Sequence, residues 1–418
     1  MNNIKFNKEL YTSVICCLFP ILLIMFAKGY NYGAILLLFS SLYFISSSYS
    51  QYNIKIIKHV SITYFFYFGI YVLSVIFRND EISDLDQISR FILAIPILWM
   101  ISHNRINKKY WILSIILSSL VAGLSASYQV YYLNLERAFS GNSPSIFFKG
   151  AMPIQLGNIA ITLGLMCIPI AIYFLRKKNT FIALLAITAS ISGILASLLS
   201  GSRGGWIVLP SIIVYLLLVN RKYINRKYRY IIFTISTLAT TTLLCIPMVK
   251  NRIFQAYDEI IQFYNNSDTF TSVGIRFELW KSSWLTFLQH PLFGASEIGR
   301  QELHRQWAEM GYISEKIGKL VTHSHNQYLD NLSVYGLIGL IALLCLFFVP
   351  AKIFISVRKN TSSELDKTIC DLGIILILGM MHYSLTQVMF AHNSGTTFYA
   401  VMLAILIGMT SNMKELKP

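Results

Sequence analysis

The stretch THSHNQYLDNLSVYGLIG, residues 322–339, marks the point where a long polar segment returns to apolar sequence. His323 and His325 stand at that boundary, and imidazole is the side chain best suited to accept a proton near neutral pH. If a helix begins here, about 100° per residue places His325, Gly336 and Gly339 on nearly one stripe. We therefore expect an imidazole at the head of a membrane helix, above small residues that admit a neighbouring helix or a lipid tail. An interfacial histidine on an ordinary packed helix is the alternative.

The rest of the chain is dominated by apolar runs. Apolar residues make up 55% of the 418 residues and charged residues only 13%. Such runs predict an all-α integral membrane protein with about twelve transmembrane helices of about 20 residues each. The first run lacks a small-residue cleavage site and is followed at once by another, so we expect no removed signal peptide. The expected spans are 11–27, 31–49, 59–77, 89–102, 110–133, 151–175, 181–199, 205–220, 230–248, 325–349, 368–390 and 396–412.

Basic residues are distributed unevenly between the two sides of these spans. With the N-terminus inside, the cytoplasmic pieces hold 21 Lys and Arg, and the opposite short loops and span ends hold six. This asymmetry predicts that both termini are cytoplasmic. It also explains the net charge of +16 without a nucleic-acid partner.

Two groups of side chains argue against a metal or disulfide framework. All six cysteines fall in predicted spans, so we expect no disulfides and no cysteine-bound metal. Four acids cluster in the external loop at residues 80–86. A divalent cation is one interpretation of this cluster, but the spacing matches no known cation-binding loop. We therefore interpret the acids as solvated.

A short external turn between spans seven and eight reads SGSRGGW, residues 200–206. Glycine-rich backbone can form a nest of N–H donors, and the guanidinium fork of Arg203 matches phosphate oxygens. The alternative is a tight turn whose arginine reaches lipid headgroups.

The one long polar segment, from Lys250 to His323, carries eight basic and eight acidic residues. It is small for an independent domain, so we expect it to fold onto the membrane surface as apolar-faced helices. Arg276 stands near the start of the second helix, four residues before Trp280. We interpret Arg276 either as an anion ligand or as a partner that stacks on Trp280. The chain thus divides into helices one to nine (1–248), a largely helical loop (249–324) and helices ten to twelve (325–418).

Three motifs together resemble those of bacterial O-antigen ligases. His325-Asn326, followed nine residues later by Gly336-Leu337-Ile338-Gly339, resembles the ligase signature. Ser202-Arg203-Gly204-Gly205-Trp206 resembles the arginine motif of the same superfamily. Arg276 to Trp280, followed by His290-Pro291-Leu292-Phe293-Gly294, resembles its large periplasmic loop. The resemblance covers the whole chain.

The resemblance implies a membrane glycosyltransferase of the C-type fold, inverting and metal-independent, without a cofactor. The donor would be O-antigen on undecaprenyl pyrophosphate and the acceptor an outer-core sugar of lipid A–core, at the periplasmic face of a Gram-negative inner membrane. By motif match, Arg203 and Arg276 would bind the pyrophosphate, and His325 would be the general base. The match implies further substrate-binding roles for Gly204, Gly205, Asn326, Gly336 and Gly339.

Other functions remain open at this point. Within the superfamily the alternatives are an O-antigen polymerase and a protein-glycosylating oligosaccharyltransferase. A multispan lipid or sugar transporter would also have about twelve spans, but it should show internal repeats and polar residues near the bilayer midplane. We find no clear repeat in the sequence, and the charged clusters lie at one face.

Overall fold

The apolar runs fold into helices throughout the part of the chain that the structure describes. The structure is a computed structural model. It describes residues 8–44, 54–145, 147–221, 247–265, 270–320 and 323–413. Every regular element within these ranges is helical, which confirms the all-α expectation.

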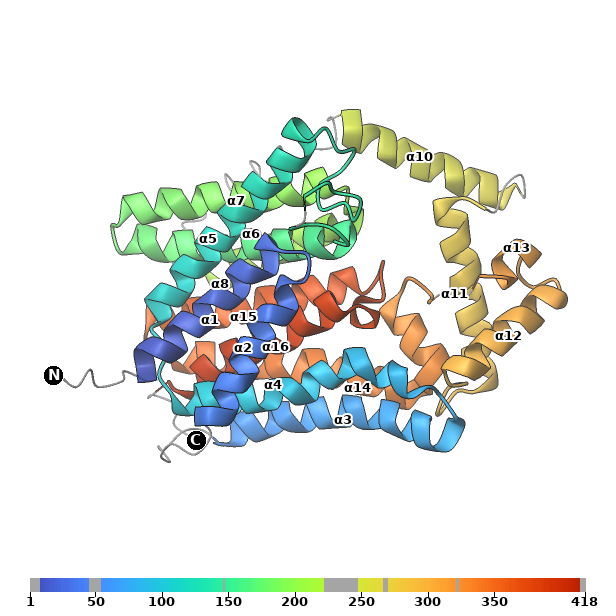
Figure 1. Ribbon diagram of the computed structural model, residues 1–418, viewed down its shortest axis with the longest axis horizontal. Helices are drawn as coiled ribbons and strands as arrows, with labels where there is room; N and C mark the ends of the chain where they lie inside the picture. Colours follow the sequence, from blue (N-terminus) through green and yellow to red (C-terminus); the bar gives the residue numbers. More distant parts are fainter. Residues whose placement is uncertain are drawn as a thin grey trace.

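The first half of the chain forms the helices on both sides of the predicted Arg203 turn (Figure 1). They are α1 (Lys8–Met25), α2 (Gly29–Phe44), α3 (Ile54–Arg78), η1 (Ile82–Asp84), α4 (Leu85–His103), α5 (Lys108–Ser127), η2 (Tyr128–Tyr132), α6 (Pro153–Arg176), α7 (Thr180–Ser200), η3 (Arg203–Ile207) and α8 (Val208–Val219).

The second half supplies the polar segment and the C-terminal helices. They are α10 (Pro247–Tyr264), α11 (Ser272–Gln289), α12 (Glu297–Glu309), α13 (Glu315–Gly318), α14 (Gln327–Asn360), α15 (Glu364–Tyr383), η4 (Met389–Ala391) and α16 (Asn393–Ser411).

Within the described residues, eight helical segments are long and apolar enough to cross a membrane. They are α1, α3, η1–α4, α5–η2, α6, α7, α14 and α16. Three more expected spans coincide with helices that are shorter or more highly charged, namely α2, α8 and α15. The expected span at 230–248 lies almost entirely outside the described residues. The protein is therefore a multi-pass membrane protein.

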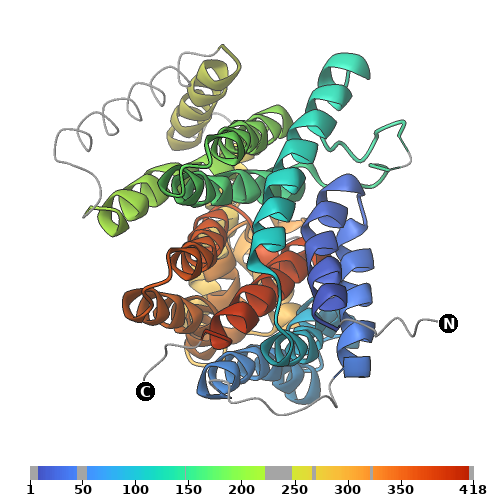
Figure 2. The same cartoon turned by 90° about the vertical axis from the view of Figure 1, so that its left-hand side faces the viewer.

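The helix α16 forms the centre of the bundle. It is buried along nearly its whole length and packs against α4, with further contacts to α2, α3, α6, α14 and α15. Seen along the bundle, α15 and α16 lie between the green helices α6–α8 and the blue helix α3 (Figure 2). The start of α1 and the end of α16 lie at the same end of the bundle, away from α11–α13 (Figure 1).

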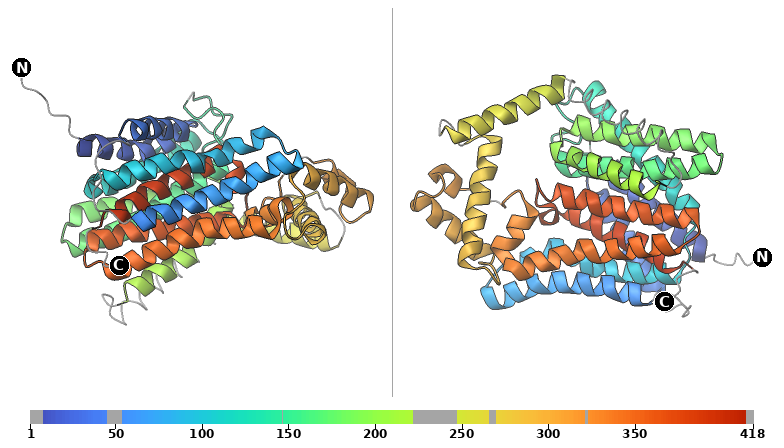
Figure 3. Two further views of the ribbon diagram at one scale, coloured as in Figure 1. Left: turned by 90° about the horizontal axis from the view of Figure 1, so that it is seen from below. Right: turned by 180° about the vertical axis from the view of Figure 1, so that it is seen from behind.

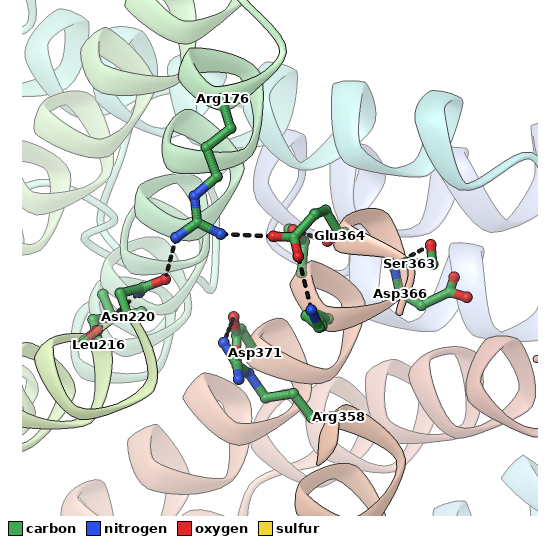
Figure 4. Close-up of polar contacts among 10 residues, drawn as sticks. Arg176, Leu216, Asn220, Arg358, Ser363, Glu364, Asp366 and Asp371 are labelled. Atoms are coloured by element: carbon green, nitrogen blue, oxygen red, sulfur yellow. Dashed lines mark hydrogen bonds and ion pairs between the residues drawn. The ribbon is translucent and has the colours of Figure 1, made fainter. Parts of the chain in front are cut away.

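A polar network joins four helices at the end of the bundle that carries the start of α1. Arg176 at the end of α6 contacts Glu364 on α15 at 2.7 Å and donates to Asn220 beyond α8 at 2.8 Å (Figure 4). Arg358 on α14 bonds Asp371 on α15 at 2.5 Å. Because each bond crosses between helices, the network fixes how these helix ends sit against one another.

The polar segment forms a helical unit beyond the opposite end of the bundle (Figure 3). Its helices α11–α13 bury a small apolar cluster of Leu279, Trp307, Ile313 and Ile317. His304 stabilises this cluster: its ring bonds Ser282 at 2.8 Å and the Ile317 carbonyl at 2.9 Å. The segment thus has a core of its own, which the sequence did not predict.

Candidate active site

His325 precedes helix α14 and is not part of it. Its backbone is left-handed, with φ 52°. Asn326 is the N-cap, and its side-chain oxygen accepts hydrogen bonds from the backbone N–H groups of Tyr328 and Leu329 at 3.0 and 3.2 Å. Because asparagine is a favoured cap residue, the helix begins after it. The expectation that a helix runs from His325 is therefore wrong, and Asn326 has a capping role.

Helix α14 is interrupted at Gly336, where φ is 65° and ψ is −158°. Residues 290–296, which include the His-Pro-Leu-Phe-Gly motif, dock into this break. Leu337 N–H donates to the Pro291 carbonyl at 2.9 Å, and Ala295 N–H donates to the Ser333 carbonyl at 2.8 Å. These bonds satisfy backbone groups that the interrupted helix leaves unpaired.

The two motifs meet through a pair of glycines. A Cβ on Gly336 would lie 2.5 Å from backbone atoms of Leu292 and Gly294, and a Cβ on Gly294 would overlap the backbone of Val334. Gly339 is buried against Tyr335. The predicted stripe of His325, Gly336 and Gly339 is therefore absent, and both glycines pack against protein. Their predicted role in substrate binding has no direct support in this packing.

The last residue of α3 and the acidic loop that follows it hold the same segment from another side. Arg78 donates to the carbonyls of Phe293 and Gly294 at 2.9 and 2.5 Å. Asp80 is buried and accepts hydrogen bonds from the backbone N–H groups of residues 297–298 at 3.0 and 3.2 Å. The negative charge of Asp80 thereby stabilises the N-terminus of α12. The interpretation of the whole acidic loop as solvated is wrong for Asp80.

The side chain of His325 is held by a residue far away in sequence. Its Nδ1 lies 2.8 Å from Oε1 of Gln387, in the turn between α15 and η4. The same amide places its Nε2 2.9 Å from Nε2 of His392. Within the described residues no hydrogen bond occupies the Nε2 atom of His325, so that atom can accept a proton.

Two further histidines surround His325. The His323 and His325 ring centroids are 4.5 Å apart, and those of His323 and His392 are 5.7 Å apart. Burial, followed by the charge of His325 and that of Arg300, lowers the pKa of His323 to about 4. Burial and the same neighbouring histidines lower the pKa of His392 to about 4. Both rings are therefore neutral at physiological pH.

The predicted arginine motif reaches this cluster from η3. Arg203 is half-buried at the start of η3, after the left-handed cap Gly201. Gly204 lies so close to Thr386 that a Cβ there would overlap the threonine hydroxyl. Thr386 is next to Gln387, which holds His325. The Arg203 motif and the histidine thus contact adjacent residues of one turn, Thr386 and Gln387.

Gly205 faces inward from the same motif. A Cβ there would lie 3.0 Å from Oδ1 of Asn158, the atom that accepts a hydrogen bond from Ser202 at 2.6 Å. Gly205 is buried, so its contacts support packing of η3 on α6.

Arg276 occupies a different element, the second turn of α11. Burial lowers its pKa, opposed by the charge of Glu259. Within the described part of the chain it makes no hydrogen bond to His325. Stacking on Trp280, one of the two interpretations of Arg276, is not among the cation–π contacts found there. Helix α11 packs against α14. Arg276 thus belongs to the unit that docks beside the histidine and not to the histidine cluster.

A cavity of about 360 Å³ adjoins the cluster on the side of His323. Its polar lining consists of Glu81, Asp84, Gln87, Glu297, Gln301, His323 and Asp330, beside the rings of Tyr71 and Tyr335. Carboxylates, amides and aromatic rings of this kind can bind a sugar through its hydroxyl groups and its apolar face.

Across the described ranges, no three His, Cys, Asp or Glu residues are grouped closely enough to hold a metal ion. A larger groove of about 700 Å³, near Tyr11 and Phe39, is apolar and lies away from this chemistry.

Gln387 and His392 were missed by the sequence analysis. Gln387 was assigned to a span at 368–390, although α15 ends at Tyr383. The polar residues Thr386 and Gln387, followed by His392 and Asn393, were a signal that the apolar run stops earlier.

Comparisons with known proteins agree with these motifs. A family model described as O-antigen ligase (Wzy_C) matches residues 188–344, which include Arg203, Arg276 and His325. An uncharacterized protein of Haemophilus influenzae is 33% identical over 406 residues, covering 94% of this chain and 97% of the relative.

Two relatives with named functions are more distant. The ComP-specific O-oligosaccharyltransferase of Acinetobacter baylyi is 24% identical over 99% of this chain and 69% of its own length. The O-antigen ligase of Escherichia coli is 24% identical over 49% of this chain and 48% of its own length. With its all-helical membrane fold and its three motifs, the chain belongs to the O-antigen ligase superfamily.

Proposed function

We propose that the protein transfers O-antigen from undecaprenyl pyrophosphate to an outer-core sugar of lipid A–core, at the periplasmic face of the inner membrane of a Gram-negative bacterium. The observation that carries this proposal is the placement of His325. Its Nδ1 faces the Gln387 carbonyl oxygen at 2.8 Å, and its Nε2 is left to accept a proton.

The reaction is an inverting displacement in one step. His325 Nε2 takes the proton of the acceptor hydroxyl as that oxygen attacks the anomeric carbon of the donor sugar. The bond from this carbon to the pyrophosphate oxygen breaks, and undecaprenyl pyrophosphate leaves with the electron pair. Arg203 and Arg276 stabilise the negative charge on the leaving group, because a guanidinium stays protonated and can form two parallel bonds to phosphate.

The neighbouring groups suit this chemistry. Neutral His323 and His392 add no positive charge beside the base. The cavity next to His323 offers space and hydrogen-bonding groups for the acceptor sugar. The proposed mechanism needs no metal ion and no cofactor.

Deletion and complementation of the gene in its native host test the substrate assignment. The proposal predicts that uncapped lipid A–core accumulates while lipid-linked polymer is still made. Retained capping with single repeat units would indicate a polymerase instead. In a purified assay with both lipid substrates, we expect EDTA to leave the rate unchanged; inhibition that a divalent ion reverses would contradict the metal-independent mechanism.

Transfer to a protein acceptor is the second candidate function. One observation favours it: the relative named an O-oligosaccharyltransferase aligns with 99% of this chain, whereas the named O-antigen ligase aligns with 49%. In the same deletion strain, unchanged lipopolysaccharide together with loss of glycan from a protein would support this candidate over the ligase.

A further inference from the structure

The turn between α15 and η4 places a buried amide between two imidazoles. Gln387 is 6% exposed, and its side chain bridges Nδ1 of His325 and Nε2 of His392 at 2.8 and 2.9 Å. We propose that Gln387 is a positioning residue that holds His325 in the Nδ1–H tautomer, and that His392 sets the orientation of the amide. This inference rests on the proposed role of His325 as the base.

The chemistry of the amide makes its orientation decisive. A carboxamide has one accepting end and one donating end. With Oε1 toward His325, the bond forms only if His325 carries its proton on Nδ1, which leaves Nε2 unprotonated. The reversed amide would donate to Nδ1 and move the ring proton to Nε2. A ring in that second tautomer has no lone pair at Nε2 and cannot take the acceptor's proton there.

His392 selects between these two orientations. The donating end of Gln387 meets Nε2 of His392, and this contact is favourable only while that nitrogen is unprotonated. Burial and the neighbouring histidines lower the pKa of His392 to about 4, so its ring is neutral at physiological pH. A protonated His392 would present an N–H to the amide nitrogen and favour the reversed amide.

Hydrogen bonds fix the turn that carries Gln387 against the start of α14, next to His325. The N–H of Gln327, the first residue of α14, donates to the Ser384 carbonyl at 2.8 Å. The side-chain oxygen of Gln327 accepts from the Phe390 N–H at 2.9 Å. Gln387 N–H donates to the Tyr383 carbonyl at 3.0 Å. The turn therefore cannot move away from His325 without breaking bonds on both sides of Gln387.

Other charged and titratable groups influence the same site. The charged and titratable residues on the elements around the histidine cluster are Arg203, Glu297, Arg300, His323, Asp330 and His392. A charge placed at Gln387 would act on His392 as well as on His325, because the side chain contacts both rings. Gln387→Met adds no charge and therefore reports on the loss of the amide.

The test compares two substitutions, Gln387→Met and Gln387→Glu, in a purified assay over about pH 5.5 to 9. The probes are an undecaprenyl-pyrophosphate-linked glycan and lipid A–core. Gln387→Met keeps the side-chain length but removes both polar ends. We expect kcat to fall at least about tenfold, on the scale of one lost hydrogen bond to a reacting group, with little change in the donor KM.

Gln387→Glu keeps the acceptor toward Nδ1–H and adds a negative charge. Its carboxylate should favour a protonated imidazole, so the acid limb of the pH–rate profile should move up by about one unit or more. We expect more activity than in Gln387→Met at high pH and a steeper loss at low pH. Asn179→Asp, a cap on the exposed α6–α7 turn, is the charge-matched control and should keep the wild-type profile.

The outcomes separate this inference from the proposed function. If His325→Ala is inactive but both Gln387 variants keep the wild-type profile, the positioning role is wrong and the base role stands. Equal losses at every pH in both variants, with a lowered unfolding temperature, would assign Gln387 a purely structural role. Activity in His325→Ala would overturn the base role and the positioning role together.

Discussion

Replacing Gly336 with alanine tests whether the break in α14 organises the site. The backbone there has φ 65° and ψ −158°, a region open almost only to glycine that costs other residues about 1–3 kcal/mol. The new Cβ would also lie 2.5 Å from backbone atoms of Leu292 and Gly294. Backbone cannot rotate away as a side chain can, so this overlap adds about 1–3 kcal/mol.

We therefore expect Gly336→Ala to destabilise the docking of residues 290–296 by about 2–6 kcal/mol. That is roughly a 30- to 20,000-fold shift toward the undocked segment, since about 1.4 kcal/mol is a factor of ten. The undocked segment should become sensitive to protease, and activity should fall because α11, which carries Arg276, ends at Gln289, immediately before this segment.

Limited proteolysis in detergent, together with the transfer assay, measures both effects. Gly69→Ala is the matched control, because a Cβ at Gly69 in α3 meets nothing within 4 Å. It should be neutral or slightly stabilising, as glycine is unfavourable within a helix. Wild-type protease resistance and activity in Gly336→Ala would refute the reasoning.

Three further predictions concern charge, pH and topology. Arg203→Lys and Arg276→Lys should each lose at least about tenfold in rate, because lysine lacks the planar fork and one charge-assisted hydrogen bond is worth roughly 1.5–3 kcal/mol; near-normal rates in folded lysine variants would exclude bidentate phosphate contact. His323 and His392 have pKa values of about 4, below the ordinary 6.5, so the unfolded chain binds more protons than the folded chain between about pH 4 and 6.5. The unfolding temperature should therefore fall as the pH is lowered through that window. The double variant His323→Ala/His392→Ala should show a weaker dependence of unfolding temperature on pH, and a pH-independent unfolding temperature in the wild type would contradict this prediction. A cysteine at Tyr264, which is exposed at the end of α10, should react with an impermeant maleimide in intact cells; reaction only after the inner membrane is permeabilised would reverse the predicted orientation.

The sequence predicted the helices well because their signal is local. Each expected span outside 230–248 falls on a helix, since long apolar runs have few other structures available in a membrane. The end of α11 at His290 and Pro291 was also readable, because proline disfavours helix at the residue before it. Arg203 and His325 could be singled out as candidates because their motifs are short and contiguous.

The remaining features depend on contacts between distant residues. Helical periodicity assumed that α14 runs unbroken past Gly336, whereas the break is stabilised by a segment about 40 residues earlier. Asp80 was taken as solvated because its partners at residues 297–298 are more than 200 positions away. Gln387 and His325 are 62 residues apart. No periodicity or local composition records such pairs.

The initial rate of purified His325→Ala with both lipid substrates tests the central claim most directly. His323→Ala is the matched control, because its ring lies 4.5 Å from that of His325 but its Nδ1 only accepts a 3.3 Å bond from the His325 backbone N–H. We predict that His325→Ala abolishes transfer while expression and membrane insertion stay intact, and that His323→Ala keeps substantial activity. A near wild-type rate in His325→Ala would contradict the general-base mechanism.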